Sequence, residues 1–383
     1  FVDRGGISNQ LAQNPPFSGQ TTYDYINGYR YTFTGSAPMN SNNAQGATGP
    51  MPSKGIMQVD LNNPANVSIS VATLPSNKTP SVQEWNLQYE RELGTNMSLS
   101  LAYVGTKGTH LITYYDYNRL QYDATLSSKN FPNLGSINTQ ATIGNSNYNS
   151  FQARLDRRFT NGLQFGASYT WSHAIDDSLG SFDGGNNVVD YRNLRAERAS
   201  SLLDMRHRFV FNGLYQLPFG HGKRWGGNWN GITNALIGGW QSNIIFTAQS
   251  GTPFDVTCGG SPAVRCDLVG DPYAGITQPY EYFNPKAFTA VPTNSAGATT
   301  RSGTTPRNYL TGPGVMDIDF SIFKGFKVTE RVNTEFRAEF FNLTNTPQFV
   351  NPNADYTGGN VGMLTSTRLG GEREIQFAFR VTF

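Results

Sequence analysis

The side chains that could bind a metal or act as general acids and bases are few and dispersed in this sequence. No histidine has a second metal-ligating residue at the spacing that zinc sites use. The histidines are His110, His173, His207 and His221. The segment "GHGKRW" lacks the spacing of a phosphate-binding loop, and "AQSGTP" does not match a nucleophile elbow. The sequence therefore indicates neither an enzyme nor a bound metal or cofactor.

Two stretches combine residues that could bind a ligand. The stretch "AIDDSLGSFDGGNNVVD" contains Asp176, Asp177, Asp183 and Asp190. Carboxylates suit calcium, but their spacing does not match an EF-hand loop, and a solvated loop is favoured. The aromatic stretch "YDYINGYRYTF" could form a sugar-binding surface, although a membrane-interface or loop cluster is the favoured interpretation.

The sequence contains two cysteines, Cys258 and Cys266, which lie close together in "TCGGSPAVRCD". Neither has another cysteine or a histidine nearby, so a metal site is not expected. We predict a small disulfide loop, which implies an oxidising compartment. Two unpaired thiols are the alternative.

The composition is typical of β-structure in a partly non-aqueous medium. The 383 residues include 25 Phe, 19 Tyr, 5 Trp and 41 Gly, and only 15% are charged, against about 25% in soluble domains. The net charge of +2 gives no reason to expect a nucleic acid partner. The mean hydropathy is −0.44. That value does not exclude a transmembrane barrel, because such a barrel needs apolar residues on only one face of each strand.

Apolar and polar residues alternate with a period of two in several segments, which predicts β-strands. One such hairpin is "EWNLQYERELGTNMSLSLAYVG", and another is "FQARLDRRFTNGLQFGASYTWS", whose Asn-Gly pair predicts a tight turn. We predict nine strands, at 84–93, 97–105, 151–159, 163–172, 208–218, 239–249, 316–326, 331–345 and 373–383.

The connections between these strands alternate in length. Short turns are expected at 94–96, 160–162 and 325–330, and an intermediate link at 218–238. Long connections are expected at 105–147, 174–206, 250–316 and 344–372. Short periplasmic turns and long extracellular loops are typical of outer-membrane barrels. We therefore predict an antiparallel transmembrane β-barrel in the bacterial outer membrane, in preference to a soluble sandwich or a soluble carbohydrate-binding protein.

The two faces of the predicted strands differ in chemistry. Charged residues facing lipid would cost about 2–4 kcal/mol each near the midplane, so the polar residues are expected to face the lumen. They include Glu335, Arg337, Glu339, Gln376 and Arg380. Aromatic residues near strand ends are expected to form interfacial girdles, or, in a soluble sandwich, to pack the core. They include Trp85, Tyr103, Tyr169, Trp171, Phe209, Tyr215 and Trp240.

Several long segments resemble those of Oar-like TonB-dependent transporters. They include "VQEWNLQYERELGTNMSLSLAYVGTKGTHL", "DMRHRFVFNGLYQLPFGHGKRW" and "GGWQSNIIFTAQSGTPFDV". The resemblance covers about residues 80–383. It implies a 22-stranded barrel with an N-terminal plug, energised by the TonB complex. A siderophore, an oligosaccharide or a peptide is compatible as the transported ligand.

The resemblance also sets expectations for the two ends of the chain. Residues 1–80 are expected to form an extracellular loop region with possible strands at "YDYINGYRYTF" and "GIMQVDL". Residues 81–383 are expected to be the C-terminal part of the barrel, without the plug and the TonB-contacting segment. The last strand resembles the signal read by the barrel-assembly machinery, at Phe377, Phe379, Val381 and Phe383. A passive pore or an adhesive barrel is the alternative function.

Overall fold

The computed structural model describes residues 76–118, 131, 137–178, 188, 190–259, 264–293, 299–329 and 331–383, together with the backbone of three earlier strands. These are β1 (Gln20–Ile26), β2 (Tyr29–Thr34) and β3 (Ile69–Thr73). The first two pair as an antiparallel hairpin that includes the aromatic stretch "YDYINGYRYTF". The possible strand at "GIMQVDL" lies outside the described residues.

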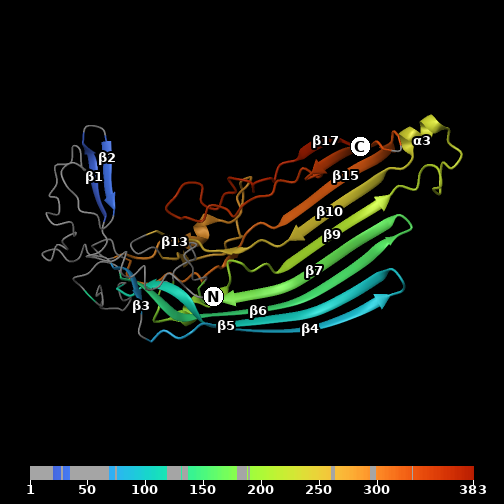
Figure 1. Cartoon of the computed structure of the whole chain (residues 1–383). Helices are drawn as coiled ribbons and strands as arrows, with labels where there is room; N and C mark the ends of the chain where they lie inside the picture. The colour runs from blue at the N-terminus through green and yellow to red at the C-terminus, as the bar shows by residue number, and fades with distance from the viewer. Residues whose placement is uncertain are drawn as a thin grey trace.

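Nine antiparallel strands form the main path of an eleven-stranded sheet, and their spatial order follows their order in the sequence (Figure 1). They are β4 (Ser81–Leu93), β5 (Met97–Asp116), β6 (Ile137–Thr160), β7 (Leu163–Asp176), β9 (His207–Gln216), β10 (Gln241–Gln249), β15 (Val315–Lys327), β16 (Asn333–Phe341) and β17 (Glu374–Thr382). The prediction of nine strands in an antiparallel all-β fold is confirmed. The parallel pairing of β3 with β6 was not predicted.

Strands β5 and β6 extend well beyond their predicted limits. Their pairing continues from Gly108 to Asp116, in the stretch that was expected to be a long loop. The register shifts on either side of Leu111. Each shift moves the following side chains out of simple alternation. The strands predicted from the period-two pattern were therefore too short.

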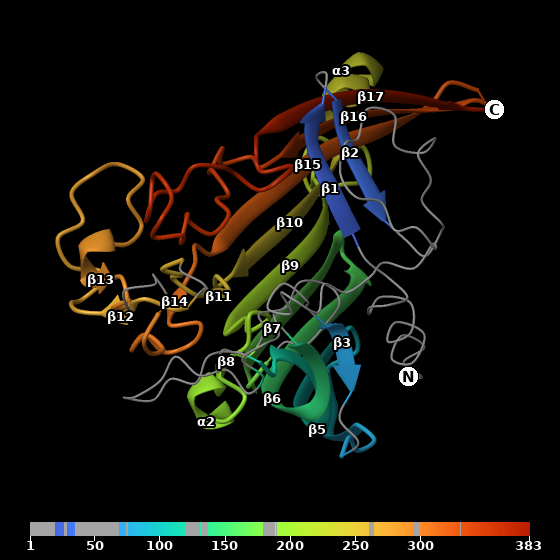
Figure 2. The same ribbon diagram turned by 90° about the vertical axis from the view of Figure 1, so that its left-hand side faces the viewer.

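The pairing register joins the apolar residues of successive strands into continuous rows. One row passes from Leu155 to Ala167, Phe211, Phe246 and Ile318, which face one another across five strands. Because residues paired in this way lie on the same side of a sheet, one face of the main sheet carries an apolar band. Figure 2 shows the sheet as an arc, which leaves one concave and one convex face.

The short connections lie at one end of the sheet, on the right in Figure 1. Asn161 and Gly162 both have positive φ, 54° and 80°. This is the backbone that a two-residue type I′ hairpin turn requires. The intermediate link at the same end contains a helix that was not predicted, α3 (Gly231–Ile237).

The long connections at the opposite end are more structured than expected. They contain α2 (Leu194–Glu197), β8 (Ala199–Ser200), β11 (Pro253–Phe254), β12 (Asp267–Leu268), η2 (Pro285–Ala287), β13 (Phe288–Thr289) and β14 (Leu310–Thr311). Phe254, Phe283, Phe288 and Leu310 are buried in a common core, against which Tyr282 and Tyr356 also pack. We call residues 250–314 and 343–373, which surround this core, the loop cap.

Candidate functional site

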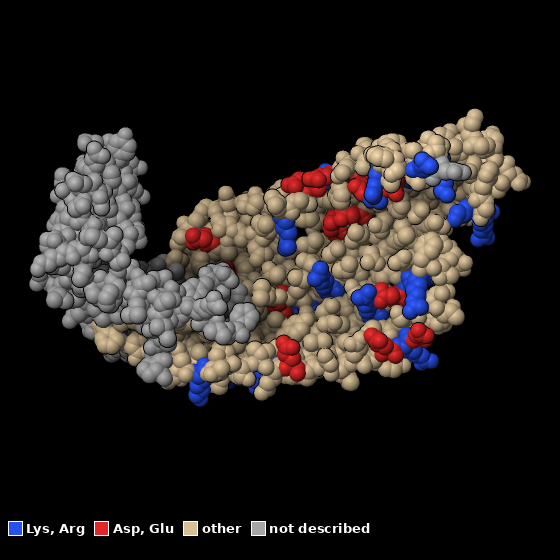
Figure 3. Space-filling model, in the orientation of Figure 1, with Lys and Arg blue, Asp and Glu red and all other residues tan. Residues whose placement is uncertain are grey.

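Polar side chains line the face of the sheet opposite the apolar band. One polar row runs through Glu90, Ser100, Arg154, Ser168 and Val210, with a single apolar member at its end. Figure 3 shows acidic and basic side chains spread over the concave side of the arc. The concave face can therefore contact water and polar solutes.

The five residues predicted to face the lumen lie together on β16 and β17. Arg337 forms ion pairs with Glu335 and Glu339, at 2.5 and 3.7 Å. Across the strand pair, Arg380 lies opposite Glu335, and Gln376 lies opposite Glu339. Acidic and basic groups thus balance locally on this face.

The predicted interfacial aromatics lie on the apolar face. Trp85 packs so closely over Gly105 that a Cβ atom there would come within 2.3 Å of the indole, so this position requires glycine. Tyr103 and Trp171 lie opposite Phe151 on its two sides. Five of the aromatics are between 36% and 56% exposed: Trp85, Tyr103, Tyr169, Trp171 and Tyr215. Such exposure of large apolar groups is typical of a surface that meets another apolar phase.

The apolar band continues onto the last strand. Phe377 pairs with Ala338, and Phe379 pairs with Phe336. The residues of the predicted assembly signal are between 49% and 97% exposed, namely Phe377, Phe379, Val381 and Phe383. Their role in assembly stays a prediction.

The band, the opposite polar face and the separation of short turns from long loops are the pattern of an outer-membrane barrel. The sequence matches the family model described as outer membrane beta barrel domain over residues 1–376. The chain belongs to the outer membrane β-barrel domain family. The predicted location in the bacterial outer membrane is confirmed. Among the described residues, no helix is both long and apolar enough to cross a membrane.

Several solved structures are similar to this barrel chain. The outer membrane transporter YddB from Escherichia coli shares 9% identity at a TM-score of 0.41, covering 83% of this chain and 34% of that chain. FpvA of P. aeruginosa, solved with a bound pyoverdine, shares 12% identity at a TM-score of 0.38, covering 79% of this chain and 27% of that chain. The copper transporter OprC shares 9% identity at a TM-score of 0.34, covering 80% of this chain and 32% of that chain. The barrel chain thus spans about a third of the length of these structures. No curated protein matches it.

The polar face contains a pocket near the loop end of the barrel chain, with a volume of about 390 Å³. Its lining is mainly apolar and also contains polar residues; it includes Leu111, Ile175 and Leu203 as well as Thr106, Ser146 and Tyr148. Such a lining can hydrogen-bond a neutral polar molecule and pack against its apolar parts. Sequence reasoning missed this pocket because its residues come from separate strands and loops.

The acidic stretch "AIDDSLGSFDGGNNVVD" is not a solvated loop throughout, and that interpretation is wrong for its first residues. Asp176 and Asp177 are each only 5% exposed. Asp177 accepts hydrogen bonds from the backbone N–H and the side-chain amide of Asn145, at 2.7 and 3.0 Å. Asp190 forms an ion pair with Arg192, and Asp183 lies outside the described residues. Within the described part of the chain, no group of three or more acidic, histidine or cysteine side chains is arranged to hold a metal.

Two buried ion pairs connect the loop cap to the rim of the sheet. Arg265 contacts Glu197 at 2.9 Å, and Arg307 contacts Asp176 at 2.6 Å. All four side chains are no more than 7% exposed. Arg307 also donates to the backbone carbonyls of Asp176 and Glu197, at 2.9 and 3.0 Å. The cap is therefore held on the rim by hydrogen bonds to charged groups, which are stronger than neutral ones.

The histidines occupy separate places. His207 contacts the Tyr169 hydroxyl at 2.8 Å, and His221 contacts the Trp229 carbonyl at 2.7 Å. His173 lies beside Arg206. Each of these three rings has a local hydrogen-bond partner.

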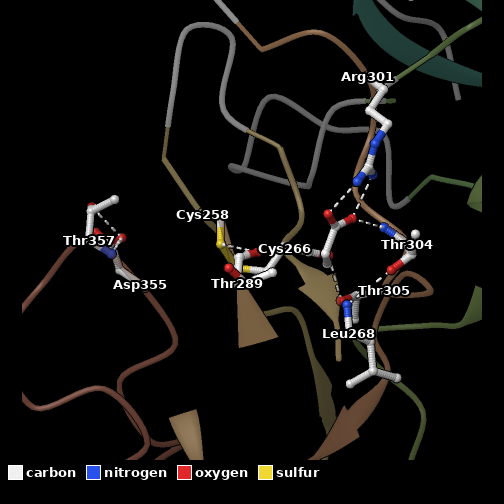
Figure 4. The surroundings of a disulfide bond; sticks show 10 residues. Cys258, Cys266, Leu268, Thr289, Arg301, Thr304, Thr305, Asp355 and Thr357 are labelled. Atoms are coloured by element: carbon white, nitrogen blue, oxygen red, sulfur yellow. Dashed lines mark hydrogen bonds and ion pairs between the residues drawn. A yellow bond between two sulfur atoms is a disulfide. The ribbon is translucent and has the colours of Figure 1, made fainter. Parts of the chain in front are cut away.

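Cys258 and Cys266 are joined by a disulfide within the loop cap (Figure 4). Cys266 is fully buried, and its carbonyl accepts hydrogen bonds from the hydroxyl and backbone N–H of Thr305, at 2.6 and 3.1 Å. The disulfide thus closes the segment that also carries Arg265, one of the residues anchoring the cap.

Removing the disulfide is expected to loosen the loop cap. Replacing Cys258 and Cys266 with alanine frees a short closed loop, which we expect to destabilise the cap by about 2–3 kcal/mol. Limited proteolysis of the outer-membrane protein should then cut within residues 250–314 faster than in the wild type, while the strands stay protected. If the wild-type protein is cleaved at the same rate with and without a reducing agent, the disulfide does not stabilise the cap and this role is contradicted.

Asp267 forms an ion pair with Arg301, which makes a second link within the cap. The guanidinium donates to both carboxylate oxygens at 2.6 and 2.5 Å, and the Thr304 backbone N–H donates at 3.0 Å. The hydrogen bonds from Arg301 have the largest effect and lower the pKa of Asp267 below its ordinary value. Burial of the carboxylate has a smaller effect in the opposite direction. Burial instead raises the pKa of Asp255.

The lowered pKa of Asp267 predicts acid sensitivity of the cap. Its contribution to stability is complete above the unfolded pKa of about 4 and is lost as the pH falls through the lower folded pKa. The variant Asp267→Asn should be less stable at neutral pH and should lose less stability on acidification below about pH 4. Pepsin cleavage across that range measures this. If pepsin cleavage of the variant and of the wild type rises equally as the pH falls, the prediction is contradicted.

Asp255→Asn provides a control of opposite sign. Because the folded pKa of Asp255 is raised, its contribution to stability is present at low pH and lost as the pH rises through the folded pKa. The variant Asp255→Asn should therefore lose stability more steeply on acidification than the wild type does.

Proposed function

We propose that this chain forms part of the wall of an Oar-like TonB-dependent transporter that takes up a ligand across the outer membrane. The observation that carries this proposal is the division of nine adjoining strands into an apolar band and a charged concave face. In this proposal the apolar band contacts lipid, the concave face lines the lumen, and the loop cap lies at the extracellular mouth. The short turns are then periplasmic.

The extent of the sheet supports a larger barrel. Along the main path of the described sheet, β4 and β17 are the outermost strands. Exposed strand edges are not tolerated in lipid, because their backbone groups would lack hydrogen-bond partners. We therefore propose that further strands complete the wall, to the 22 implied by the resemblance, with residues 81–383 as its C-terminal part. A plug and a TonB-contacting segment would then belong to the same protein.

Ligand contact is proposed to begin at the loop cap and to continue along the concave face. The pocket beside Tyr148 lies where the polar face approaches the rim. Among the residues that we describe, the lining carries no unpaired charge, since the carboxylate of Asp176, which also lines it, is paired with Arg307. This lining suits an oligosaccharide or the neutral part of a siderophore or peptide.

A second candidate is an adhesive barrel that binds a ligand without transporting it. Exposed apolar side chains on the cap favour this reading, since Val269, Tyr273 and Tyr280 are between 53% and 63% exposed. Exposed aromatic residues are typical of interaction sites.

Two measurements on the full-length protein distinguish these functions. A TonB-dependent transporter should bind the purified periplasmic domain of TonB and should remain closed to ions in planar bilayers. A steady open-channel current without TonB binding would overturn the proposal in favour of a passive pore. Ligand capture by the cells with neither current nor TonB binding would favour the adhesive barrel.

A further inference from the structure

The link between β9 and β10 folds into a structured element at the short-turn end of the sheet (Figure 1). We call residues 217–240, which include α3, the turn-end foot. The foot contains no Asp or Glu but contains Lys223 and Arg224, together with three tryptophans. It therefore combines a positive charge with an unusual aromatic content.

Helix α3 of the foot lies against the outer, apolar face of the sheet, whereas Lys223 donates a hydrogen bond to Gln216, on the polar side of β9, at 2.8 Å. Lys324 is on the same face as Phe336, its partner across β15 and β16. Its ammonium group donates to the carbonyls of Asn234 and Ala235 in α3, at 3.1 and 2.5 Å. The Trp240 ring packs edge-on against Phe336, with centroids 6.3 Å apart. These contacts fix α3 beside the lower edge of the apolar band.

The interior of the foot is ordered by its own aromatic residues. The ring of Phe219 packs against both Trp225 and Trp229, with centroid distances of 5.5 and 6.5 Å. The Arg224 guanidinium lies 5.1 Å above the Trp225 ring. Asn230 caps the helix by accepting a hydrogen bond from the Thr233 N–H at 2.7 Å. The foot is thus a defined surface before any partner binds.

Despite this order, the foot leaves its aliphatic side chains uncovered. Ile232 is 75% exposed, Leu236 is 68% exposed and Ile237 is 50% exposed. Ile232 and Leu236 are four residues apart, so they lie on the same side of the helix. Trp240 joins α3 to the apolar band, because its indole N–H donates to the Leu236 carbonyl at 2.8 Å and its ring packs against Phe336.

We propose that the turn-end foot is a membrane anchor that sits in the periplasmic phospholipid leaflet. Ile232 and Leu236 enter the acyl-chain boundary, and Lys223 and Arg224 contact anionic headgroups such as phosphatidylglycerol. This combination of an apolar helix face with nearby cations is how helices bind the membrane interface. Continuity with the apolar band selects lipid over a protein partner. The anchor rests on the barrel orientation proposed above.

Lipid contact can be measured with a fluorophore on a single introduced cysteine. The full-length protein carries Leu236→Cys, labelled with an environment-sensitive dye, in vesicles of phosphatidylcholine and phosphatidylglycerol. Brominated acyl chains should quench the dye by roughly half or more, because the side chain lies at the acyl boundary. Ile232→Cys should behave in the same way. Aqueous iodide should quench both dyes weakly.

Matched positions separate failure of the anchor from failure of the barrel orientation. Thr95→Cys lies in a short turn at the same end and should be quenched by iodide and not by bromine. Phe377→Cys lies on the apolar band and should be quenched by bromine. If Phe377→Cys responds to bromolipid while Leu236→Cys behaves like Thr95→Cys, the anchor is wrong and the barrel stands. If neither responds, the orientation itself is wrong.

The headgroup contact has its own test. The double variant Lys223→Gln/Arg224→Gln should weaken the bromine quenching at Leu236→Cys, and removing phosphatidylglycerol should have the same effect on the unaltered foot. Quenching that is independent of both changes would overturn the anionic-lipid contact. Protection of Leu236→Cys from both quenchers would show that protein covers the foot, and would overturn the anchor.

Discussion

Replacing Phe246 with arginine is expected to destabilise the folded protein by about 2–4 kcal/mol, the cost of a cation on the lipid face near the midplane. Phe246 lies in the middle of the apolar band, opposite Phe211 on one side and Ile318 on the other. It also packs against Phe209, with ring centroids 5.9 Å apart. Neither Phe211 nor Ile318, the described residues paired with this position, offers an arginine there an acidic partner.

The adjacent residue provides the matched control. Thr247 points to the opposite, polar face and lies across from Asp317 and Val210. Thr247→Arg introduces the same charge one residue away, beside a carboxylate. Its cost should stay below about 1 kcal/mol. The free energy of unfolding in urea, measured in phospholipid vesicles, gives both values. Equal effects of the two variants would contradict the assignment of the faces.

Replacing Arg307 with alanine is expected to open the loop cap, at a local cost of about 3–5 kcal/mol. Arg307 is 3% exposed. Its removal leaves the Asp176 carboxylate buried without its partner and removes donors to two backbone carbonyls. Removing one partner of a buried pair costs more than the pair contributes, because the remaining charge stays desolvated.

Hydrogen exchange separates opening of the cap from unfolding of the sheet. Amides of residues 250–314 should exchange faster in Arg307→Ala, whereas those of β10 and β15 should stay protected. Arg154→Ala serves as the control, because Arg154 pairs with Asp156 on an open surface and is 67% exposed. Its loss should cost at most about 1 kcal/mol. Exchange in the cap that is no faster than in this control would contradict the anchoring role.

The strands of the sheet were predictable because both of their environments impose a period of two. Every residue of β16 from Thr334 to Phe341 lies on either the apolar or the polar face. The alternation is therefore visible within each segment, without knowledge of its partners. The tight turn at Asn161 and Gly162 was equally local, because it depends on two residues that tolerate positive φ.

The loop cap and the foot were not predictable in the same way. Arg307 and Asp176 are separated by 131 residues, and nothing in the sequence near either one indicates the other. Helix α3 has only seven residues, too few for a clear helical period. Its position against Lys324 depends on the register of β15. Such features follow from tertiary contacts, which a single sequence does not show.

Cysteine scanning along β16 tests the central claim most directly. In the full-length protein in outer membranes, each residue from 335 to 340 is replaced in turn and treated with a water-soluble maleimide. We predict that cysteines at Glu335, Arg337 and Glu339 react, because they face the aqueous lumen, and that those at Phe336, Ala338 and Phe340 do not. Reaction without a two-residue alternation would contradict a membrane-spanning strand with one face in lipid and the other in water.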